Sequence, residues 1–531
     1  MTRNTGCLII GASTLCHTMC GVFFSFSIVI IAFTIPATSI QPNILLIMAD
    51  QMRADGMGCA GNPVAKTPNL DKLASEGVRY KYAFSSTPTC TPARAAILTG
   101  LSPWYHGMLG YGAIASHYDY EMPHVLADGG YYTCSIGKDH FGWNRTSDRG
   151  VAHGYNLTQL YDGLPGEEDD YDKWFAETDP GVNPMSTGLL YNDYRGAVYA
   201  LPEYYHPTAW VGRTATNFIK TYNFSKPLFL KVSFHRPHSP YDPPKRWMEE
   251  FDPKTLPKAW TGGNWDSQYD LHFNKTPDPG IWCGNVGESQ VGKSRQAYYG
   301  SIGFVDEWIG NIFSALEERM VRNTTFILFT ADHGDMMGDH YHWRKGYPYY
   351  GSANIPMLLS WPPHMEAANG GKVTVKRGTV LDNIAELRDL FPTFLDVANI
   401  PIAKGKTLNG SSLITTLTTE DKGLGWRQYV DLEHNICYNA TNHWNALTNG
   451  HIKYIYRAYF GDEQLFDLDT DQEERNNLAA DEEWKDTLLE WRETMVKQFE
   501  AEGRGSEWVQ DGQLVKRVKG MLYSPNYPKK S

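Results

Sequence analysis

The sequence predicts an α/β fold with a mixed, mostly parallel sheet flanked by helices, followed by a smaller C-terminal α+β subdomain. Continuous apolar runs bounded by polar residues recur along the chain, and such runs are typical of parallel strands buried on both faces. Segments with helical spacing separate the runs, and strands that alternate with helices indicate parallel pairing. The length of 531 residues allows one large domain and a smaller one.

The composition restricts the class of protein. Lys and Arg number 48 against 60 Asp and Glu, and the resulting net charge of −12 excludes the basic surface of a nucleic-acid-binding protein. Hydrophobic residues make up 42% and charged residues 20%, proportions that allow a sizeable core and exclude a disordered chain. We therefore expect a globular enzyme or a large binding domain, and its oligomeric state stays open.

Residues 1–40 have the composition of a targeting segment. They contain the basic Arg3, no acidic residue, the apolar run 22–33, and then Pro36 with small residues. This order is typical of a secretory signal, which we favour over an uncleaved signal anchor. The anchor stays open because the apolar character extends back towards Cys7. Asn-x-Ser/Thr triplets support secretion to an extracellular or lysosomal location as a glycoprotein; they begin at Asn144, Asn156, Asn223, Asn274, Asn323, Asn409 and Asn439.

Cysteine usage agrees with one chemically used thiol. Removal of the signal leaves an odd number of cysteines, so at least one is unpaired or modified. The pairing among the other four stays open. The five are Cys90 together with Cys59, Cys134, Cys283 and Cys437.

Four apolar runs are predicted strands, and each leads into residues that can carry chemistry. A helix is predicted over 305–316, between the third run and the fourth. Open α/β sheets bind ligands outside the carboxyl ends of their strands, so these residues predict one shared polar site. The runs are 43–50 with Asp50, 131–137 with Lys138 and His140, 227–233 with His235 and His238, and 326–332 with Asp332.

A predicted short helix places Cys90 at an anion-binding position. Thr91 can cap this helix, Pro92 suits its first turn, and Gly100 ends it. Cys90 then lies at the helix N-terminus, where free N–H groups favour an anion. Arg94 lies one turn away on the same face. A buried structural cysteine is the alternative, but the neighbouring arginine favours an anion site.

The chain divides into a large and a small part. We place a catalytic domain over 42–400, up to the end of a helix that begins near Leu387. A C-terminal subdomain follows over 401–505, with strands at 427–431 and 452–457 and a helix at about 481–501. Residues 506–531 are expected to form an extended tail.

Motifs in consistent order along the mature chain resemble those of the type I, formylglycine-dependent sulfatases, whose fold is alkaline-phosphatase-like. The most specific is Cys90-Thr91-Pro92-Ala93-Arg94, which resembles the Cys-x-Pro-x-Arg signature. The others are Asp50-Gln51, Thr67-Pro68-Asn69-Leu70-Asp71, Gly137-Lys138-Asp139-His140, Pro237-His238-Ser239-Pro240, Asp332-His333-Gly334-Asp335 and Lys345-Gly346.

The resemblance implies a modified cysteine and a metal ion. In the family, a formylglycine-generating enzyme oxidises the signature cysteine to 3-oxoalanine (formylglycine) during secretion, and the same is expected at Cys90. The aldehyde hydrates, one hydroxyl attacks sulfur, and the second later expels the sulfate to regenerate the aldehyde. A Ca²⁺ ion lowers the pKa of the attacking hydroxyl. The implied metal ligands are Asp50, Gln51, Cys90, Asp332 and His333.

The resemblance also assigns roles to the basic residues. Lys138 and Lys345 would bind sulfate oxygens, and Arg94 would hold the diol and the anion. His238 would protonate the leaving alcohol, and His140 would take the proton from the second hydroxyl. Other histidines carry weaker expectations: His235 and Arg236 are candidate substrate contacts, whereas His340 and His342 are expected to be polar loop residues.

Three positions depart from the family pattern. Gln51 replaces a frequent Asp, which removes one negative charge from the metal site and also occurs in relatives that cleave phosphonate monoesters and phosphodiesters. Tyr350 and Asn354 replace a frequent Glu and Arg, which puts substrate contacts in doubt.

The expected function is hydrolysis of a sulfate ester on a carbohydrate or on an aryl or alkyl group. One alternative is a phosphodiesterase or phosphonate monoester hydrolase on the same scaffold, and another is a silent binding protein in which Cys90 stays unmodified. Zinc phosphatases are disfavoured because their nucleophile is Ser or Thr. Aromatic residues in 160–210 are candidate sugar-stacking groups.

Overall fold

The structure is a computed structural model that describes residues 41–528 except 142–148, 164–168, 185 and 419–425. The predicted signal segment and the triplet at Asn144 lie outside the described residues. Gln41–Ser531 form one compact unit. Among the described residues, no helix is both long and apolar enough to cross a membrane.

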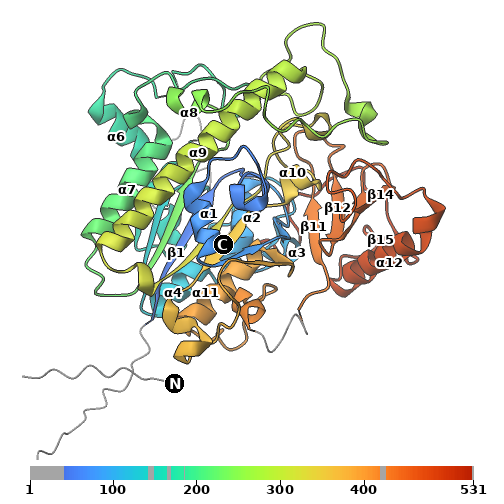
Figure 1. The fold of residues 1–531 in the computed structure, drawn as a ribbon. Helices are drawn as coiled ribbons and strands as arrows, with labels where there is room; N and C mark the ends of the chain where they lie inside the picture. Colours follow the sequence, from blue (N-terminus) through green and yellow to red (C-terminus); the bar gives the residue numbers. More distant parts are fainter. Residues whose placement is uncertain (1–40, 142–148, 164–168, 185, 419–425, 529–531) are drawn as a thin grey trace, which may run out of the picture. The chain divides into compact units, whose positions relative to one another are not determined.

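The central element is a mixed, mostly parallel sheet of eight strands, as the sequence predicts (Figure 1). The four predicted runs form β4, β6, β1 and β7, which are adjacent and mutually parallel. Only β8 runs antiparallel, to β7 on one side and to β2 on the other. In spatial order the strands are β5 (Leu157–Leu160), β4 (Tyr132–Gly137), β6 (Leu228–Phe234), β1 (Asn43–Ala49), β7 (Thr325–Thr330), β8 (Met357–Ser360), β2 (Val78–Tyr80) and β9 (Thr379–Leu381).

Helices cover both faces of this sheet (Figure 1). On one face α7 (Pro207–Thr221) packs along the long α9 (Glu288–Glu318), which contains the helix predicted at 305–316. The other face carries α2 (Cys90–Thr99), α4 (Met122–Asp128) and α11 (Leu390–Ala398). The remaining helices of this part are α1 (Pro68–Ser75), α3 (Pro103–His106), α5 (Arg149–Ala152), α6 (Asp170–Thr178), α8 (Lys245–Glu249) and α10 (Tyr350–Ala353).

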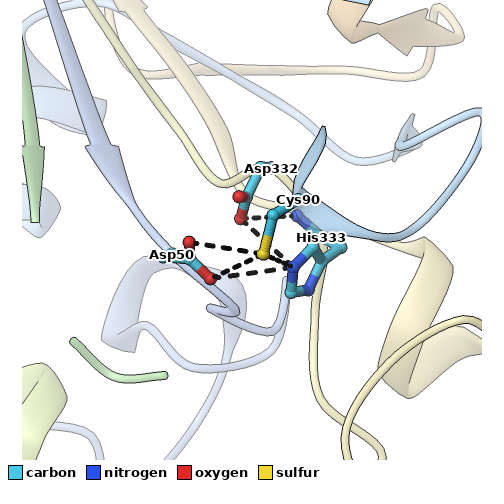
Figure 2. A group of neighbouring side chains, drawn as sticks. All are labelled: Asp50, Cys90, Asp332 and His333. Atoms are coloured by element: carbon cyan, nitrogen blue, oxygen red, sulfur yellow. Dashed lines mark hydrogen bonds and ion pairs between the residues drawn. The ribbon is translucent and has the colours of Figure 1, made fainter. Parts of the chain in front are cut away.

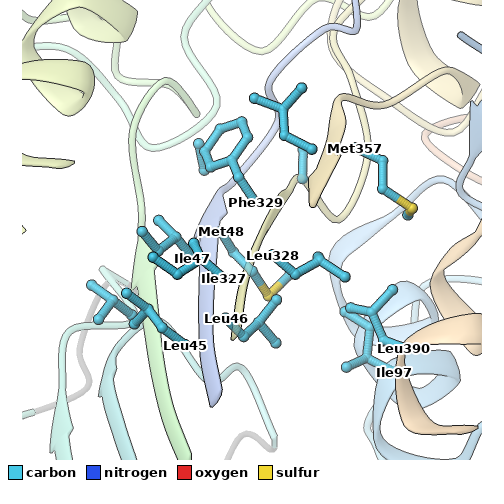
Figure 3. Packing of buried hydrophobic residues seen from close by; sticks show 14 of the residues in the cluster. Leu45, Leu46, Ile47, Met48, Ile97, Ile327, Leu328, Phe329, Met357 and Leu390 are labelled. Atoms are coloured by element: carbon cyan, nitrogen blue, oxygen red, sulfur yellow. The ribbon is translucent and has the colours of Figure 1, made fainter. Parts of the chain in front are cut away.

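The apolar strands form the core between the helical layers (Figure 3). Leu46 and Ile47 in β1 are fully buried and pair with Leu328 and Phe329 in β7. Burial of each such side chain contributes about 1.5–3 kcal/mol to stability. The two central strands therefore hold the residues that follow them, at their carboxyl ends, in fixed positions.

The helix at Cys90 begins differently from the prediction. Thr89 is the N-cap residue and Cys90 is the first helical residue, so the expected capping role of Thr91 is wrong. Thr89 Oγ1 lies 3.0 Å from His434 Nε2. The left-handed cap at Gly100, with φ of +66°, agrees with the prediction.

The C-terminal part is an antiparallel sheet with one long helix. Its strands are β11 (Val430–His434), β12 (Trp444–Thr448), β13 (Ile452–Arg457) and β14 (Asp462–Asp467), and α12 spans Lys485–Ala501. The expected tail forms the short pair β15 (Val509–Gln510) and β16 (Gln513–Leu514) and then returns to the body. There Leu522 O accepts from Leu109 N–H at 2.9 Å. A further short pair joins β3 (Ala83–Phe84) and β10 (Ala385–Glu386).

Candidate active site

The carboxyl ends of the central strands and the start of α2 bring four side chains together (Figure 2). Asp50 follows β1, Asp332 and His333 follow β7, and Cys90 begins α2. All four are fully buried, and one ligand atom from each lies within 4.8 Å of the others. The structure thus brings these four predicted site residues together at the carboxyl ends of the strands.

Cys90 Sγ lies at the centre of the cluster. It is 3.0 Å from Lys345 Nζ, 3.2 Å from His333 Nε2 and 3.7 Å from Asp50 Oδ2. Lys138 Nζ lies 3.8 Å away. Two ammonium groups therefore face the position of the predicted nucleophile, and an anion placed there would contact both.

Arg94 joins the two carboxylates of the cluster. Its guanidinium lies 3.1 Å from Asp50 Oδ2 and 2.9 Å from Asp332 Oδ2, and its Nη1 donates to Lys138 O at 2.6 Å. Lys138 Nζ also pairs with Asp50 Oδ2 at 2.7 Å. Because these charges are buried, the pairs also fix the orientation of each partner.

The residues present fit a bound cation. Gln51 Nε2 donates to Asp335 Oδ2 at 2.6 Å, whereas its buried Oε1 has no hydrogen-bond partner in the described part of the chain. His333 Nδ1 bonds Gly334 O at 2.9 Å, which leaves Nε2 facing the carboxylates at 3.6 Å from each. The unsatisfied amide oxygen of Gln51 and the carboxylates of Asp50 and Asp332 are oxygen donors of the kind that a hard divalent ion prefers.

The buried charges shift the pKa values of the cluster. Burial would raise the pKa of Asp50, but Lys138, His238 and His333 hold it well below its usual value. Burial and Asp50 raise the pKa of the Cys90 thiol, yet Lys138 and Lys345 lower it further. The local field therefore favours negative charge on both side chains.

His238 and Lys345 form a hydrogen-bonded pair beside Cys90. His238 Nδ1 bonds Ser239 O at 2.6 Å, and its Nε2 lies 2.8 Å from Lys345 Nζ. Burial, Lys345 and Lys138 all lower the pKa of His238 far below its usual value. The imidazole is therefore neutral, and its Nε2 accepts a hydrogen bond from Lys345 Nζ.

Two tyrosines in the site were not predicted from the sequence. Tyr111 O–H lies 3.3 Å from His140 Nε2, and Tyr191 O–H lies 3.3 Å from Lys138 Nζ. Tyr191 belongs to the aromatic segment 160–210, and the Tyr191 ring also packs 5.0 Å from the His238 ring. Asp335, which holds Gln51, stood within a quoted motif without a role. Loop residues of this kind carry no periodic pattern that would reveal them.

The other histidines belong to different environments. The ring centroids of His235 and His238 lie 4.8 Å apart. Arg236 Nη2 forms an ion pair with Asp242 Oδ1 at 2.8 Å. His340 and His342 are buried rather than solvated, which corrects the expectation of polar loop residues. Aromatic rings surround both, and burial lowers the pKa of His342 to about 3.

Tyr350 and Asn354, two of the departures from the family pattern, make contacts within the fold. Tyr350 packs 5.5 Å from Trp260, and its backbone N–H binds the Glu474 carboxylate. Asn354 forms a backbone bridge with Phe84.

The chain is similar to known proteins over most of its length. A family model described as "Sulfatase" matches residues 42–400, and one described as "N-sulphoglucosamine sulphohydrolase, C-terminal" matches 338–501. An arylsulfatase of Clostridium perfringens is 36% identical over 90% of this chain and 98% of its own length. A choline-sulfatase of Rhizobium meliloti is 28% identical over 83% of each chain.

Solved structures share the fold at lower identity. The phosphonate monoester hydrolase of Agrobacterium radiobacter superposes with a TM-score of 0.71 at 24% identity, over 90% of this chain and 99% of its own. A protein solved in complex with its substrate D-glucosamine-2-N,6-O-disulfate superposes with a TM-score of 0.68 at 20% identity, over 88% of this chain and 99% of its own.

Proposed function

Since this chain belongs to the sulfatase family and is a sulfatase, we propose that it hydrolyses sulfate esters with an aldehyde formed from Cys90, beside one Ca²⁺ ion. The observation that carries the proposal is the environment of Cys90 Sγ, which marks the position of the oxygen that would replace it. Two ammonium groups and three potential metal ligands surround that position.

Five residues would hold the ion: Asp50, Gln51, Asp332, His333 and the modified Cys90. When bound, Ca²⁺ would lower the pKa of a hydroxyl group on the hydrated aldehyde and hold one sulfate oxygen. The Gln51 oxygen suits calcium because it is buried and otherwise unsatisfied, and calcium prefers oxygen ligands.

Lys138 and Lys345 would hold the sulfate against the nucleophile. Each ammonium faces the Sγ position from a different strand end or loop, so together they clamp an anion and stabilise the charge that grows as the S–O bond breaks. Arg94 orients the two carboxylates of Asp50 and Asp332.

The His238–Lys345 pair would supply the proton to the leaving alcohol. Lys345 Nζ donates a hydrogen bond to the unprotonated Nε2 of His238, and a sulfate that draws this ammonium towards its oxygens would free Nε2. The negative charge of the bound sulfate would favour uptake of a proton from solvent at Nε2, and His238 would donate that proton to the ester oxygen as the S–O bond breaks. His140 would accept the proton of the remaining hydroxyl. Burial and Lys138 lower the pKa of His140 well below its usual value, so this imidazole is neutral and able to accept.

Mass spectrometry of one peptide tests the proposal. Trypsin releases Tyr82–Arg94, in which Cys90 is the one cysteine. In protein secreted by cells with a formylglycine-generating enzyme, we expect this peptide to be lighter by about 18 Da than the unmodified sequence. A peptide that contains Cys59 serves as the unmodified control. An unmodified Cys90 thiol in such material would favour the silent binding protein instead.

The substrate proposed is a sulfated carbohydrate or an aryl or alkyl sulfate. A second activity, on phosphodiesters or phosphonate monoesters, is favoured by Gln51, because a neutral amide replaces a carboxylate and leaves the site more positive. Turnover of a nitrophenyl phosphodiester above background would support it, and a rate equal to background would remove it.

A secretory location is also proposed. The asparagines of four predicted sequons, Asn156, Asn223, Asn274 and Asn323, are exposed, as glycan attachment requires. We expect a mass decrease on treatment of the secreted protein with an N-glycosidase. No change in mass would contradict the glycoprotein.

A further inference from the structure

Outside the active site, two histidines and a glutamate converge at the surface. His117, Glu121 and His124 each offer one ligand atom, and these atoms lie within 4.8 Å of one another. His117 Nδ1 is 3.7 Å and His124 Nε2 is 3.6 Å from the same oxygen, Glu121 Oε2. Glu121 directly precedes α4, and His124 lies in its first turn.

The carboxylate is held with one oxygen directed at the histidines. Glu121 is 1% exposed, and its Oε1 accepts from Tyr118 N–H at 2.7 Å and contacts His153 Nδ1 at 2.9 Å. Its Oε2 is buried and has no hydrogen-bond partner within the described residues. A buried carboxylate oxygen without a hydrogen-bond donor destabilises the fold, because its lost hydration is not replaced. A cation bound at Oε2 would remove this cost.

The distances from the two imidazole nitrogens to Glu121 Oε2 can be compared with those of a hydrogen bond and with those of a zinc site. A charge-assisted hydrogen bond from a protonated imidazole would bring nitrogen and oxygen to about 2.7–2.9 Å. A tetrahedral zinc ion with bonds of about 2.0–2.1 Å holds its ligand atoms roughly 3.3–3.4 Å apart. The observed separations of 3.6 and 3.7 Å exceed the first range and lie a few tenths of an ångström from the second.

We propose that His117, Glu121 and His124 bind a divalent transition-metal ion, with Zn²⁺ as the best fit. Two imidazoles and one carboxylate suit zinc rather than calcium or magnesium, and the exposed edge leaves the fourth position to water. His117 and His124 side chains are 64% and 45% exposed, so the ion can enter from solvent. Binding exchanges the contact of His124 Nε2 with Ala152 O, at 3.2 Å, for the metal bond.

The contact between Glu121 and His153 gives the site an outer shell. A ligating carboxylate is normally fixed by a further hydrogen bond, and loss of such a partner typically weakens metal binding by roughly 10- to 100-fold. The ion would join the segment that begins at Tyr111, which contacts His140, to the start of α4. It would thus brace a wall of the active site without entering the reaction.

Zinc binding by the full secreted protein, saturated with Ca²⁺, tests the proposal. Equilibrium dialysis against micromolar Zn²⁺ compares the wild type with His117→Ala/His124→Ala and with His364→Ala, which removes another exposed histidine. Any zinc taken up by the Asp50 cluster is common to all three. We expect the wild type and His364→Ala to bind one equivalent more than the double variant.

A second variant tests whether a loss of zinc binding could result from misfolding. His153→Gln should lower zinc affinity by about 10- to 100-fold while leaving the thermal unfolding temperature in zinc-free buffer near that of the wild type. Equal zinc content in the wild type and the double variant overturns the proposal. So does half-saturation only at millimolar Zn²⁺, because that is the behaviour of scattered surface histidines.

Discussion

Replacement of Lys345 by methionine removes one charge at the point where the proposed sulfate binds. Lys345 Nζ is 3.0 Å from Cys90 Sγ and 2.8 Å from His238 Nε2, so the variant loses contact with both the proposed nucleophile and the proposed proton donor. At 3.0 Å, two unit charges interact by about 5.5 kcal/mol for an effective dielectric constant near 20. Water that enters the space reduces this value.

Loss of one preorganised group that stabilises transition-state charge typically costs about 2.7–4 kcal/mol. We therefore expect kcat/KM of Lys345→Met for 4-nitrophenyl sulfate to fall by roughly 10²- to 10³-fold. Lys258→Met, which removes a lysine whose side chain is 79% exposed, is the matched control and should keep its rate.

The assay needs a check on folding, since Lys345 is only 5% exposed. Thermal unfolding and the formylglycine content of the Tyr82–Arg94 peptide should both match the wild type. Under those conditions, a loss of less than threefold in kcat/KM would refute the placement of the sulfate between Lys345 and Cys90.

The remaining predictions concern the nucleophile, the acid and the metal. Cys90→Ala should abolish turnover and keep the fold, and retained sulfatase activity would exclude Cys90 as the source of the nucleophile. His238→Ala should slow alkyl sulfates more than nitrophenyl sulfate, because a good leaving group needs little protonation; equal losses would remove its acid role. Gln51→Glu places a carboxylate 2.6 Å from Asp335 and should lower the ratio of phosphodiester to sulfate turnover about 10-fold, or ~1.4 kcal/mol, whereas an unchanged ratio contradicts the charge argument. Removal of Ca²⁺ should lower the unfolding temperature, since a ligand at a hundredfold excess over its Kd stabilises by about 2.7 kcal/mol; identical melting with and without Ca²⁺ argues against a bound calcium.

The role of the C-terminal sheet could not be predicted from the sequence. His434, at the end of β11, contacts Thr89, the residue before Cys90. The two are separated by more than half of the chain, and neither stands in a recognisable pattern. Their contact exists because the antiparallel sheet packs against the start of α2, so the sheet supports the residue that precedes Cys90.

The sequence by itself determined the central strands and the residues that follow them. A continuous apolar run must be buried on both faces, so β1, β4, β6 and β7 and the side chains at their carboxyl ends could be located from local pattern alone. The start of α2 was placed to within two residues, because the cap was expected at Thr91 and lies at Thr89.

Only the tertiary structure decided how close these groups lie and which further residues join them. The orphaned oxygen of Gln51, the Lys345–His238 pair, and the tyrosines at positions 111 and 191 all depend on loops whose paths carry no periodic signal. Hydrogen bonds and ion pairs act over a few ångströms, so which groups interact is decided by the packing of distant segments. The histidines beside Glu121 were equally hidden, because only the fold turns both of them towards one buried oxygen.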